Sequence, residues 1–137
     1  MMKYRILLIV FSVCLVASAI LSVIPPSNVC GANNSGCSIV NNSKYGKTFG
    51  VRNSYWGIFA FTVLISLTIS QLVKPNKKKE NFIALGIILG SIVAIYFIYL
   101  QLFVIKAYCK YCMVVDIGIL FALAIIVVDR LFQLRWK

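Results

Sequence analysis

Four long apolar stretches place the strongest constraint on how this chain can fold. They cover residues 6–24, 55–73, 82–105 and 111–128. A helix needs roughly 20 apolar residues to cross about 30 Å of hydrocarbon, and each stretch is near that length. Hydrocarbon offers backbone amides no partner, so such stretches cross as helices rather than as loops. We therefore predict an all-α integral membrane protein, a bundle of four transmembrane helices. The composition agrees, because only 12% of the residues are charged.

The first and last stretches each admit a second interpretation. Lys3 and Arg5 precede the first stretch, and residues 17–19 resemble a signal-peptide cleavage site. The apolar run nevertheless continues to Ile24, which is long enough to span, so we favour a retained helix. The last stretch is short and contains Asp116, so a buried or re-entrant helix is the alternative there.

The basic residues predict the orientation of the bundle. With both termini in the cytoplasm, nine basic residues flank the spans on the inner side and five on the outer side, as the positive-inside rule requires. The inner set is Lys3, Arg5, Lys74, Lys77, Lys78, Lys79, Arg130, Arg135 and Lys137. The outer set is Lys44, Lys47, Arg52, Lys106 and Lys110. This distribution accounts for the net charge of +11 without a nucleic-acid partner, and the inner cluster can also contact anionic membrane lipid.

Residues 25–54 form the long polar segment between the first two spans. The segment is rich in Asn, Ser and Gly, a composition typical of loops and turns. Long connections in compact proteins are usually functional or disordered. We predict a cap folded over the outer end of the bundle, within a single domain that covers residues 1–137.

Four of the five cysteines fall on the predicted outer side. Cys30 and Cys37 lie in the cap, and Cys109 and Cys112 form a CxxC at the start of the last span. Disulfides persist outside the cytoplasm. Cys14 lies in the middle of the first span, where a cysteine behaves as a small hydrophobic residue.

The CxxC has the features of a reactive thiol pair. Residues three apart at a helix start have both sulfurs on one side, close enough to bond. The helix N-terminus and the neighbouring Lys106 and Lys110 would stabilise the attacking thiolate. Two alternatives remain, namely two structural disulfides and a zinc site with four cysteine ligands. The spacing of six residues between Cys30 and Cys37 suits a disulfide better than a zinc knuckle.

Two thiol pairs at one membrane surface predict an electron relay. A soluble thiol donor would reduce the Cys30–Cys37 disulfide, and the Cys37 thiolate would attack Cys109 to form a transient disulfide. Cys112 would then be released as a thiolate facing the bundle. The sequence has no haem histidine, flavin motif or dinucleotide fingerprint. A lipid-soluble quinone is therefore the natural acceptor.

Three sequence segments carry a family resemblance. They are residues 37–46 (CSIVNNSKYG), residues 49–51 (FGV) and residues 53–57 (NSYWG). With four spans, a loop cysteine pair first and a CxxC opening the last span, the chain resembles the vitamin K epoxide reductase family, including its bacterial and archaeal thiol–quinone oxidoreductases. Another group of four-helix disulfide-forming quinone reductases in bacteria has the reverse cysteine order.

The resemblance implies roles for individual residues. Cys30 and Cys37 would be the shuttle pair, and Cys109–Cys112 the active site, with Cys112 contacting the quinone. The Asn53 amide would donate a hydrogen bond to a quinone oxygen.

Three further positions follow from the same resemblance. Ser43 would place a hydroxyl near the active-site disulfide, and Phe49 would form a wall of the pocket. Asp116 departs from the vertebrate members, which have a tyrosine four residues past the last cysteine. This aspartate either relays protons to the quinone or is a helix-start residue near the N-terminal dipole.

These observations predict a membrane thiol–quinone oxidoreductase that supports disulfide formation through a thioredoxin-fold partner. Its substrate would be a quinone of the menaquinone, ubiquinone or vitamin K type, and it would bind no metal. The alternatives are a vitamin K epoxide reductase in the narrow sense and, from another class, a structural or zinc-binding membrane protein.

Overall fold

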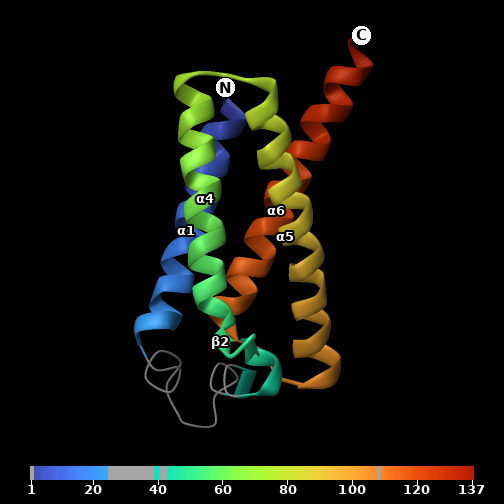
Figure 1. Ribbon diagram of the computed structural model, residues 1–137. Helices are drawn as coiled ribbons and strands as arrows, with labels where there is room; N and C mark the ends of the chain where they lie inside the picture. Colours follow the sequence, from blue (N-terminus) through green and yellow to red (C-terminus); the bar gives the residue numbers. More distant parts are fainter. Residues whose placement is uncertain (1, 25–38, 41–42, 108) are drawn as a thin grey trace.

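The computed structural model describes residues 2–24, 39–40, 43–107 and 109–137, which include four long helices. The four helices are α1 (Met2–Val23), α4 (Asn53–Val73), α5 (Lys77–Tyr99) and α6 (Lys110–Arg135). All four are long and apolar enough to cross a membrane, taking α5 together with the turn that follows it. The predicted all-α bundle with four candidate spans is confirmed (Figure 1).

The helices are arranged so that both chain ends lie at the same end of the bundle (Figure 1). α1 packs along both α4 and α6, and α5 packs along α6. We call the end of the bundle that holds the two chain ends the termini end. The opposite end, where α6 begins at Lys110, is the cysteine end. The C-terminal part of α6 extends away from the other helices (Figure 1).

The last helix is longer than the sequence predicted. α6 has 26 residues and continues to Arg135, whereas the apolar stretch ends at residue 128. The residues beyond 128 include charged side chains, so a prediction based on apolar residues alone left them out of the helix. The last helix is therefore not short, and its length no longer favours a re-entrant helix.

The core of the bundle follows one face of α1. Its buried side chains recur every three or four residues, the spacing of a single helix face; they are Tyr4, Leu7, Phe11, Cys14, Ala17, Ser18 and Leu21. Cys14 is 1% exposed, which confirms that it is a buried residue. It lies against α6 so closely that a methyl group on Gly118 would collide with its sulfur. A larger residue than glycine would therefore push α1 and α6 apart.

The third span does not end as a regular α-helix. The last five residues, η2 (Leu100–Val104), form a π-helical turn, closed where the Ile105 N–H donates to the Leu100 carbonyl at 2.7 Å. Lys106 then adopts a left-handed conformation with φ 58°, which is uncommon for a residue with a side chain. The sequence predicted an uninterrupted helix to residue 105, and periodicity gave no sign of this wider turn. Such turns occur frequently at functional sites.

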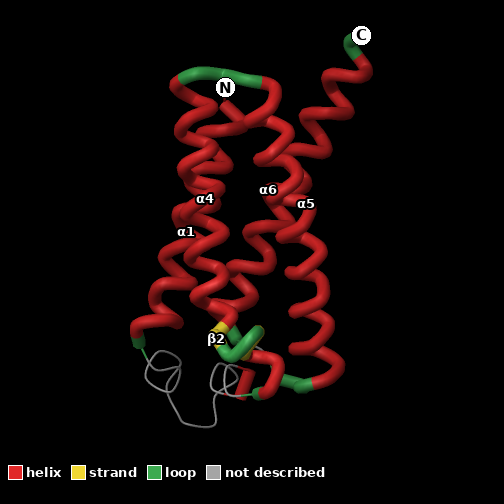
Figure 2. The backbone as a smooth tube through the Cα atoms, in the orientation of Figure 1, coloured by secondary structure: helices red, strands yellow, loops and turns green. Residues whose placement is uncertain are grey.

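The described part of the cap is a short turn and a hairpin at the start of α4 (Figure 2). η1 (Lys44–Gly46) precedes β1 (Lys47–Thr48) and β2 (Val51–Arg52), which pair antiparallel. The two residues between the strands, Phe49 and Gly50, have φ values of 54° and 79°. Positive φ at both central residues is the geometry of the tight turns that match strand twist. Cys30 and Cys37 lie outside the described residues.

Candidate active site at the cysteine end

Cys109 and Cys112 lie where the connection after η2 enters α6. Cys109 is the N-cap of α6 and is fully buried, whereas Cys112 is half-buried. Leu21 at the end of α1 and Val40 of the cap pack with Cys109 in a small apolar cluster. The cap and α1 therefore close over one cysteine of the CxxC and leave the other more accessible.

The first turn of α6 directs a backbone donor at the buried sulfur. The Cys112 N–H donates to Sγ of Cys109, with 3.4 Å between nitrogen and sulfur. An N-cap side chain accepts such bonds because the first N–H groups of a helix have no partner within the helix. The positive end of the helix dipole favours negative charge at the same place. The arrangement therefore suits a sulfur that is a thiolate during part of a reaction.

Gln101 connects this cysteine to the buried carboxylate of α6. Its Oε1 accepts a hydrogen bond from the Cys109 N–H at 3.0 Å, and its Nε2 donates to Oδ2 of Asp116 at 3.3 Å. Gln101 is 2% exposed and Asp116 is 6% exposed. The sequence analysis missed Gln101. The available signal was a glutamine within the apolar stretch 82–105, eight residues before the first cysteine of the CxxC.

Asp116 lies within the bundle rather than at its surface. It follows Cys112 by four residues, about one helical turn. Within the part of the chain that the structure describes, its hydrogen bond is to the Gln101 amide and no lysine or arginine forms an ion pair with it. A buried carboxylate without a cation is costly in a membrane, and such residues often have a functional role.

Two of the cap residues singled out from the sequence, Asn53 and Ser43, make hydrogen bonds within the described part of the cap. Asn53, the first residue of α4, donates from Nδ2 to the Tyr45 carbonyl at 2.8 Å and accepts from Oγ1 of Thr48 at 2.7 Å. Ser43 donates to the Val40 carbonyl at 2.8 Å. Since Val40 and Cys109 belong to one buried apolar cluster, Ser43 is connected to that cluster through one residue.

Phe49 is the most exposed of the predicted site residues. It lies at the tip of the hairpin with 92% of its surface exposed, and its ring is edge-on to Trp56 at 6.5 Å between centroids. The structure does not place it beside either described cysteine of the CxxC. Its role in a quinone pocket stays a prediction.

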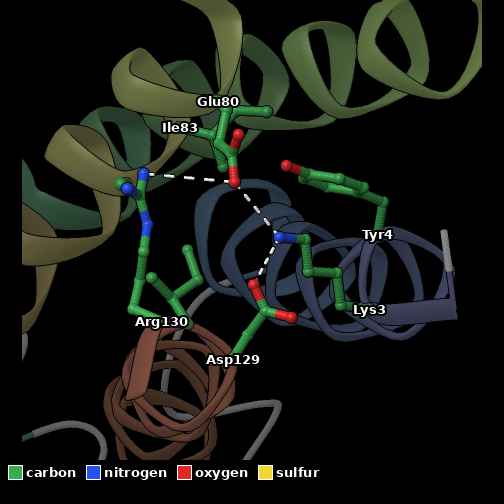
Figure 3. A pocket seen from close by; sticks show the side chains of 8 residues that line it. Lys3, Tyr4, Glu80, Ile83, Asp129 and Arg130 are labelled. Carbon is green, nitrogen blue, oxygen red and sulfur yellow. Dashed lines mark hydrogen bonds and ion pairs between the residues drawn. The ribbon is translucent and has the colours of Figure 1, made fainter. Parts of the chain in front are cut away.

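A second polar cluster occupies the termini end (Figure 3). Nζ of Lys3 lies 3.2 Å from Oε1 of Glu80 and 2.6 Å from Oδ2 of Asp129, so one lysine joins α1, α5 and α6. Arg130 approaches the same Glu80 oxygen at 4.0 Å, and Tyr4 lies beside the lysine (Figure 3). The cavity enclosed by these side chains has a volume of about 10 Å³. Such a volume admits a single water molecule at most, so this cluster is not a substrate pocket.

A larger groove lies on the face of α5 and α6 towards the termini end. It measures about 340 Å³ and is lined by apolar side chains and Arg130. Neither this groove nor the small cavity includes a cysteine. The chemistry therefore points to the cysteine end, while these two hollows lie at the other. Among the described residues, no group of three or more His, Cys, Asp or Glu is placed to hold a metal ion. The four-cysteine zinc alternative involves Cys30 and Cys37, which lie outside those residues.

Comparison with known proteins supports the assignment made from the cysteine pattern. The family model described as the vitamin K epoxide reductase family matches residues 5–127 of the 137-residue chain. The match reaches all four helices and includes both cysteine pairs. Searches of curated proteins and of solved structures found no match. Members of the matched family are membrane oxidoreductases that generally use quinones and thioredoxin-like partners. The chain belongs to the vitamin K epoxide reductase family.

Proposed function

We propose that the protein is a thiol–quinone oxidoreductase that passes electrons from a thioredoxin-fold partner through Cys30 and Cys37 to the Cys109–Cys112 pair and on to a quinone. The observation that carries the proposal is the CxxC at the start of α6. One of its sulfurs is buried at a helix N-cap and accepts a backbone N–H, and the other is half-buried three residues later. This asymmetry suits a pair in which one sulfur is attacked and the other leaves.

The chemistry balances as two linked exchanges. The reduced Cys30–Cys37 pair gives two electrons and two protons to the Cys109–Cys112 disulfide, through a Cys37–Cys109 mixed disulfide that Cys30 resolves. The resulting Cys109–Cys112 dithiol reduces the quinone to a quinol and becomes a disulfide again. The partner's dithiol is oxidised to a disulfide in restoring the Cys30–Cys37 pair. The net reaction turns one dithiol and one quinone into one disulfide and one quinol.

The contact between the cap and Cys109 supports transfer at this site. Val40, three residues after Cys37 in the sequence, lies in the same buried apolar cluster as Cys109. Ser43 donates a hydrogen bond to the Val40 carbonyl. A residue close in sequence to the shuttle cysteine therefore lies in one cluster with the cysteine that the shuttle would attack.

Asn53 and Asp116 are the proposed contacts to the quinone. A primary amide has two N–H donors, and the Tyr45 carbonyl uses one of those on Asn53. The second would serve a quinone oxygen that gains negative charge as electrons arrive. Asp116 would supply a proton, since quinone reduction consumes two. An aspartate in place of the vertebrate tyrosine favours this activity over vitamin K epoxide reduction in the narrow sense.

The orientation of the protein is part of the proposal. The count of nine basic residues at the proposed inner ends of the spans against five at the outer ends supports a cysteine end outside the cytoplasm. A cysteine introduced at position 34, in a chain without its native cysteines, should react with an impermeant maleimide in intact cells. Reaction only after permeabilisation of the membrane would invert the topology and remove the relay.

Stopped-flow kinetics test the function most directly. A reduced thioredoxin-fold protein is mixed with the purified enzyme and a quinone, and quinol formation is followed for the wild type and for each single cysteine variant. We expect turnover by the wild type and its loss without any one of the four outer cysteines. Stoichiometric zinc in the purified protein, together with no quinol formation, would instead support the zinc-binding alternative.

A further inference from the structure

Gln101 makes three hydrogen bonds at the cysteine end. It uses three groups at once: its backbone carbonyl accepts from the Ala107 N–H at 3.0 Å, Oε1 accepts from the Cys109 N–H, and Nε2 donates to Asp116. Two of these bonds go to the connection that leads from η2 into α6. The third goes to the carboxylate about one turn beyond the CxxC. Gln101 thus contacts the connection before the CxxC, the N-cap of α6 and the carboxylate one turn beyond the CxxC.

The connection from residue 105 to 109 needs such a support. The π-helical turn ends the third span irregularly, and Lys106 has a left-handed backbone, which is strained for a residue with a side chain. The Gln101 oxygen accepts the hydrogen bond of the buried Cys109 backbone N–H. Loss of this acceptor would weaken the hold on a buried donor and favour a shift of the Cys109 backbone.

The amide is also the chemical group that suits both of its neighbours. The Cys109 N–H can only donate, and an ionised carboxylate can only accept. A side chain between them must accept on one side and donate on the other, which glutamine does and glutamate or methionine does not. The orientation of the amide is therefore determined by its partners.

We infer that Gln101 is a positioning residue for the reaction proposed above. Its side chain bridges the Cys109 backbone and Asp116, so that the nucleophilic pair and the carboxylate keep one fixed relation to each other. A misplacement of about 1 Å in a reacting group can slow a reaction about 100-fold. Gln101 acts through the backbone that holds the Cys109 sulfur.

Exchanging the amide and the carboxylate between positions 101 and 116 tests the hydrogen bond between them while side-chain volume stays nearly constant. In Gln101→Glu, two acceptors face each other and the bridge is lost on the Asp116 side. In Asp116→Asn alone, the new amide oxygen at position 116 can still accept from Gln101, so the bridge remains. The double variant Gln101→Glu with Asp116→Asn restores it with donor and acceptor exchanged. The introduced amide at position 116 can then donate to the introduced carboxylate at position 101.

Quinone turnover with dithiothreitol as reductant is the first measurement. We expect Gln101→Glu to lower kcat by about 10- to 100-fold, on the scale of a lost positioning contact. The double variant should return to within about 3-fold of Asp116→Asn alone, which is the signature of a direct pairwise interaction. A double variant no faster than Gln101→Glu would overturn the inference.

Amide hydrogen exchange at Cys109 is the second measurement, and it needs no turnover. Gln101→Met removes both side-chain bonds at similar volume, and the exchange of a peptide containing Cys109 should rise by about 10-fold or more. Gln71→Met is the matched control: Gln71 is 4% exposed and its Oε1 accepts from the Asn76 N–H at 2.9 Å, at the termini end. That variant should change neither exchange at Cys109 nor kcat.

The inference rests on the proposed function, and the two measurements separate their failures. If the wild type forms no quinol, the proposed function fails, while exchange still decides whether Gln101 holds Cys109. Wild-type protection of the Cys109 amide in Gln101→Met would show that Gln101 holds nothing, whatever the turnover.

Discussion

The acidic residues at the two ends of the bundle have different kinds of partner. The chain has three acidic residues, and two of them, Glu80 and Asp129, lie at the termini end paired with Lys3. The third, Asp116, lies at the cysteine end, where its described partner is the neutral Gln101 amide. One end neutralises its carboxylates with cations, and the other holds a carboxylate with a neutral amide.

The difference separates a structural clamp from a site suited to chemistry. Ion pairs between α1, α5 and α6 fix the relative positions of three helices and leave the charges satisfied. A carboxylate held by an amide is fixed in position yet keeps its capacity to take up a proton. Variants at the cysteine end should therefore change turnover, and variants at the termini end should change stability.

The largest effect should come from Cys112→Ser at the cysteine end. The variant removes the sulfur proposed to leave, so quinone reduction should fall by about 1,000-fold or more, as for other covalent catalytic residues. Thermal unfolding should change little, because Cys112 is half-buried and serine is of similar size. Quinol formation and an unfolding scan on the same preparation measure both.

The same variant also tests the order of the relay. In this variant the Cys109 thiolate can attack Cys37 of an oxidised Cys30–Cys37 disulfide and release Cys30 as a thiolate. The resulting Cys37–Cys109 disulfide should accumulate, because no Cys112 is present to displace Cys37 from Cys109, and non-reducing peptide mapping would identify it. Cys37→Ser should abolish transfer from a protein dithiol and spare oxidation of dithiothreitol, which is small enough to reach Cys109. A trapped Cys30–Cys109 bond would mean that the two cap cysteines exchange roles.

Asn53→Ala should have the next largest effect. A hydrogen bond to a developing charge is worth about 1.5–3 kcal/mol, so quinone reduction should slow by about 10- to 100-fold. Exchange between the two cysteine pairs should be nearly unchanged, since Asn53 has no part in sulfur chemistry.

Thr48→Val is the matched control for Asn53→Ala. It removes the 2.7 Å hydrogen bond to Oδ1 of Asn53 but leaves both amide N–H donors in place. Turnover should therefore stay within about 3-fold of the wild type, because at most one neutral hydrogen bond is lost. Equal losses in the two variants would show that Asn53 acts by holding the cap rather than by binding quinone.

Much of this architecture could be predicted from the sequence, because a chain that crosses hydrocarbon must satisfy its backbone hydrogen bonds internally and therefore forms helices. Continuous apolarity over about 20 residues predicts a spanning helix whatever the neighbouring segments do. The burial of Cys14 and the position of the CxxC at the start of a span follow from the same pattern. The end of α6 was missed because its last turns are charged, and a hydropathy boundary is not a helix boundary.

The polar contacts could not be predicted, because they depend on which helices are neighbours. Lys3 and Arg130 were counted only as topology signals. In the structure, Lys3 of α1 and Arg130 of α6 each approach Glu80 of α5. Gln101 lies in the π-helical turn that follows α5, and from there it donates to Asp116 of α6. Asn53 was predicted to bind a quinone, which stays a prediction. Its hydrogen bonds to Tyr45 and Thr48, which the sequence did not predict, make it part of the cap.

Glu80→Gln tests the termini end. The side chain is 11% exposed and lies near three cations, so loss of its charge leaves Lys3 with Asp129 alone. Loss of one partly buried, charge-assisted bond should lower the free energy of unfolding by about 1.5–3 kcal/mol. Quinone turnover, measured at a temperature where the variant is folded, should stay within about 2-fold of the wild type. A 10-fold loss of turnover with intact folding would show that the two ends are coupled, against the comparison.

Lys77→Met should have the smallest effect, although Lys77 also forms an ion pair with Glu80. Its Nζ lies 3.4 Å from Oε2 of Glu80, but its side chain is 84% exposed, and exposed pairs of this kind contribute about 0–1 kcal/mol. Lys77 is also the first residue of α5, where a cation meets the positive end of the helix dipole and loses about 0.3–1 kcal/mol. The two contributions nearly cancel, so the free energy of unfolding should change by less than about 0.5 kcal/mol. The small difference that remains should disappear at about 1 M salt, where charges are screened within roughly 3 Å. A loss comparable to that of Glu80→Gln would mean that the clamp depends on its exposed partner as much as on the buried Lys3.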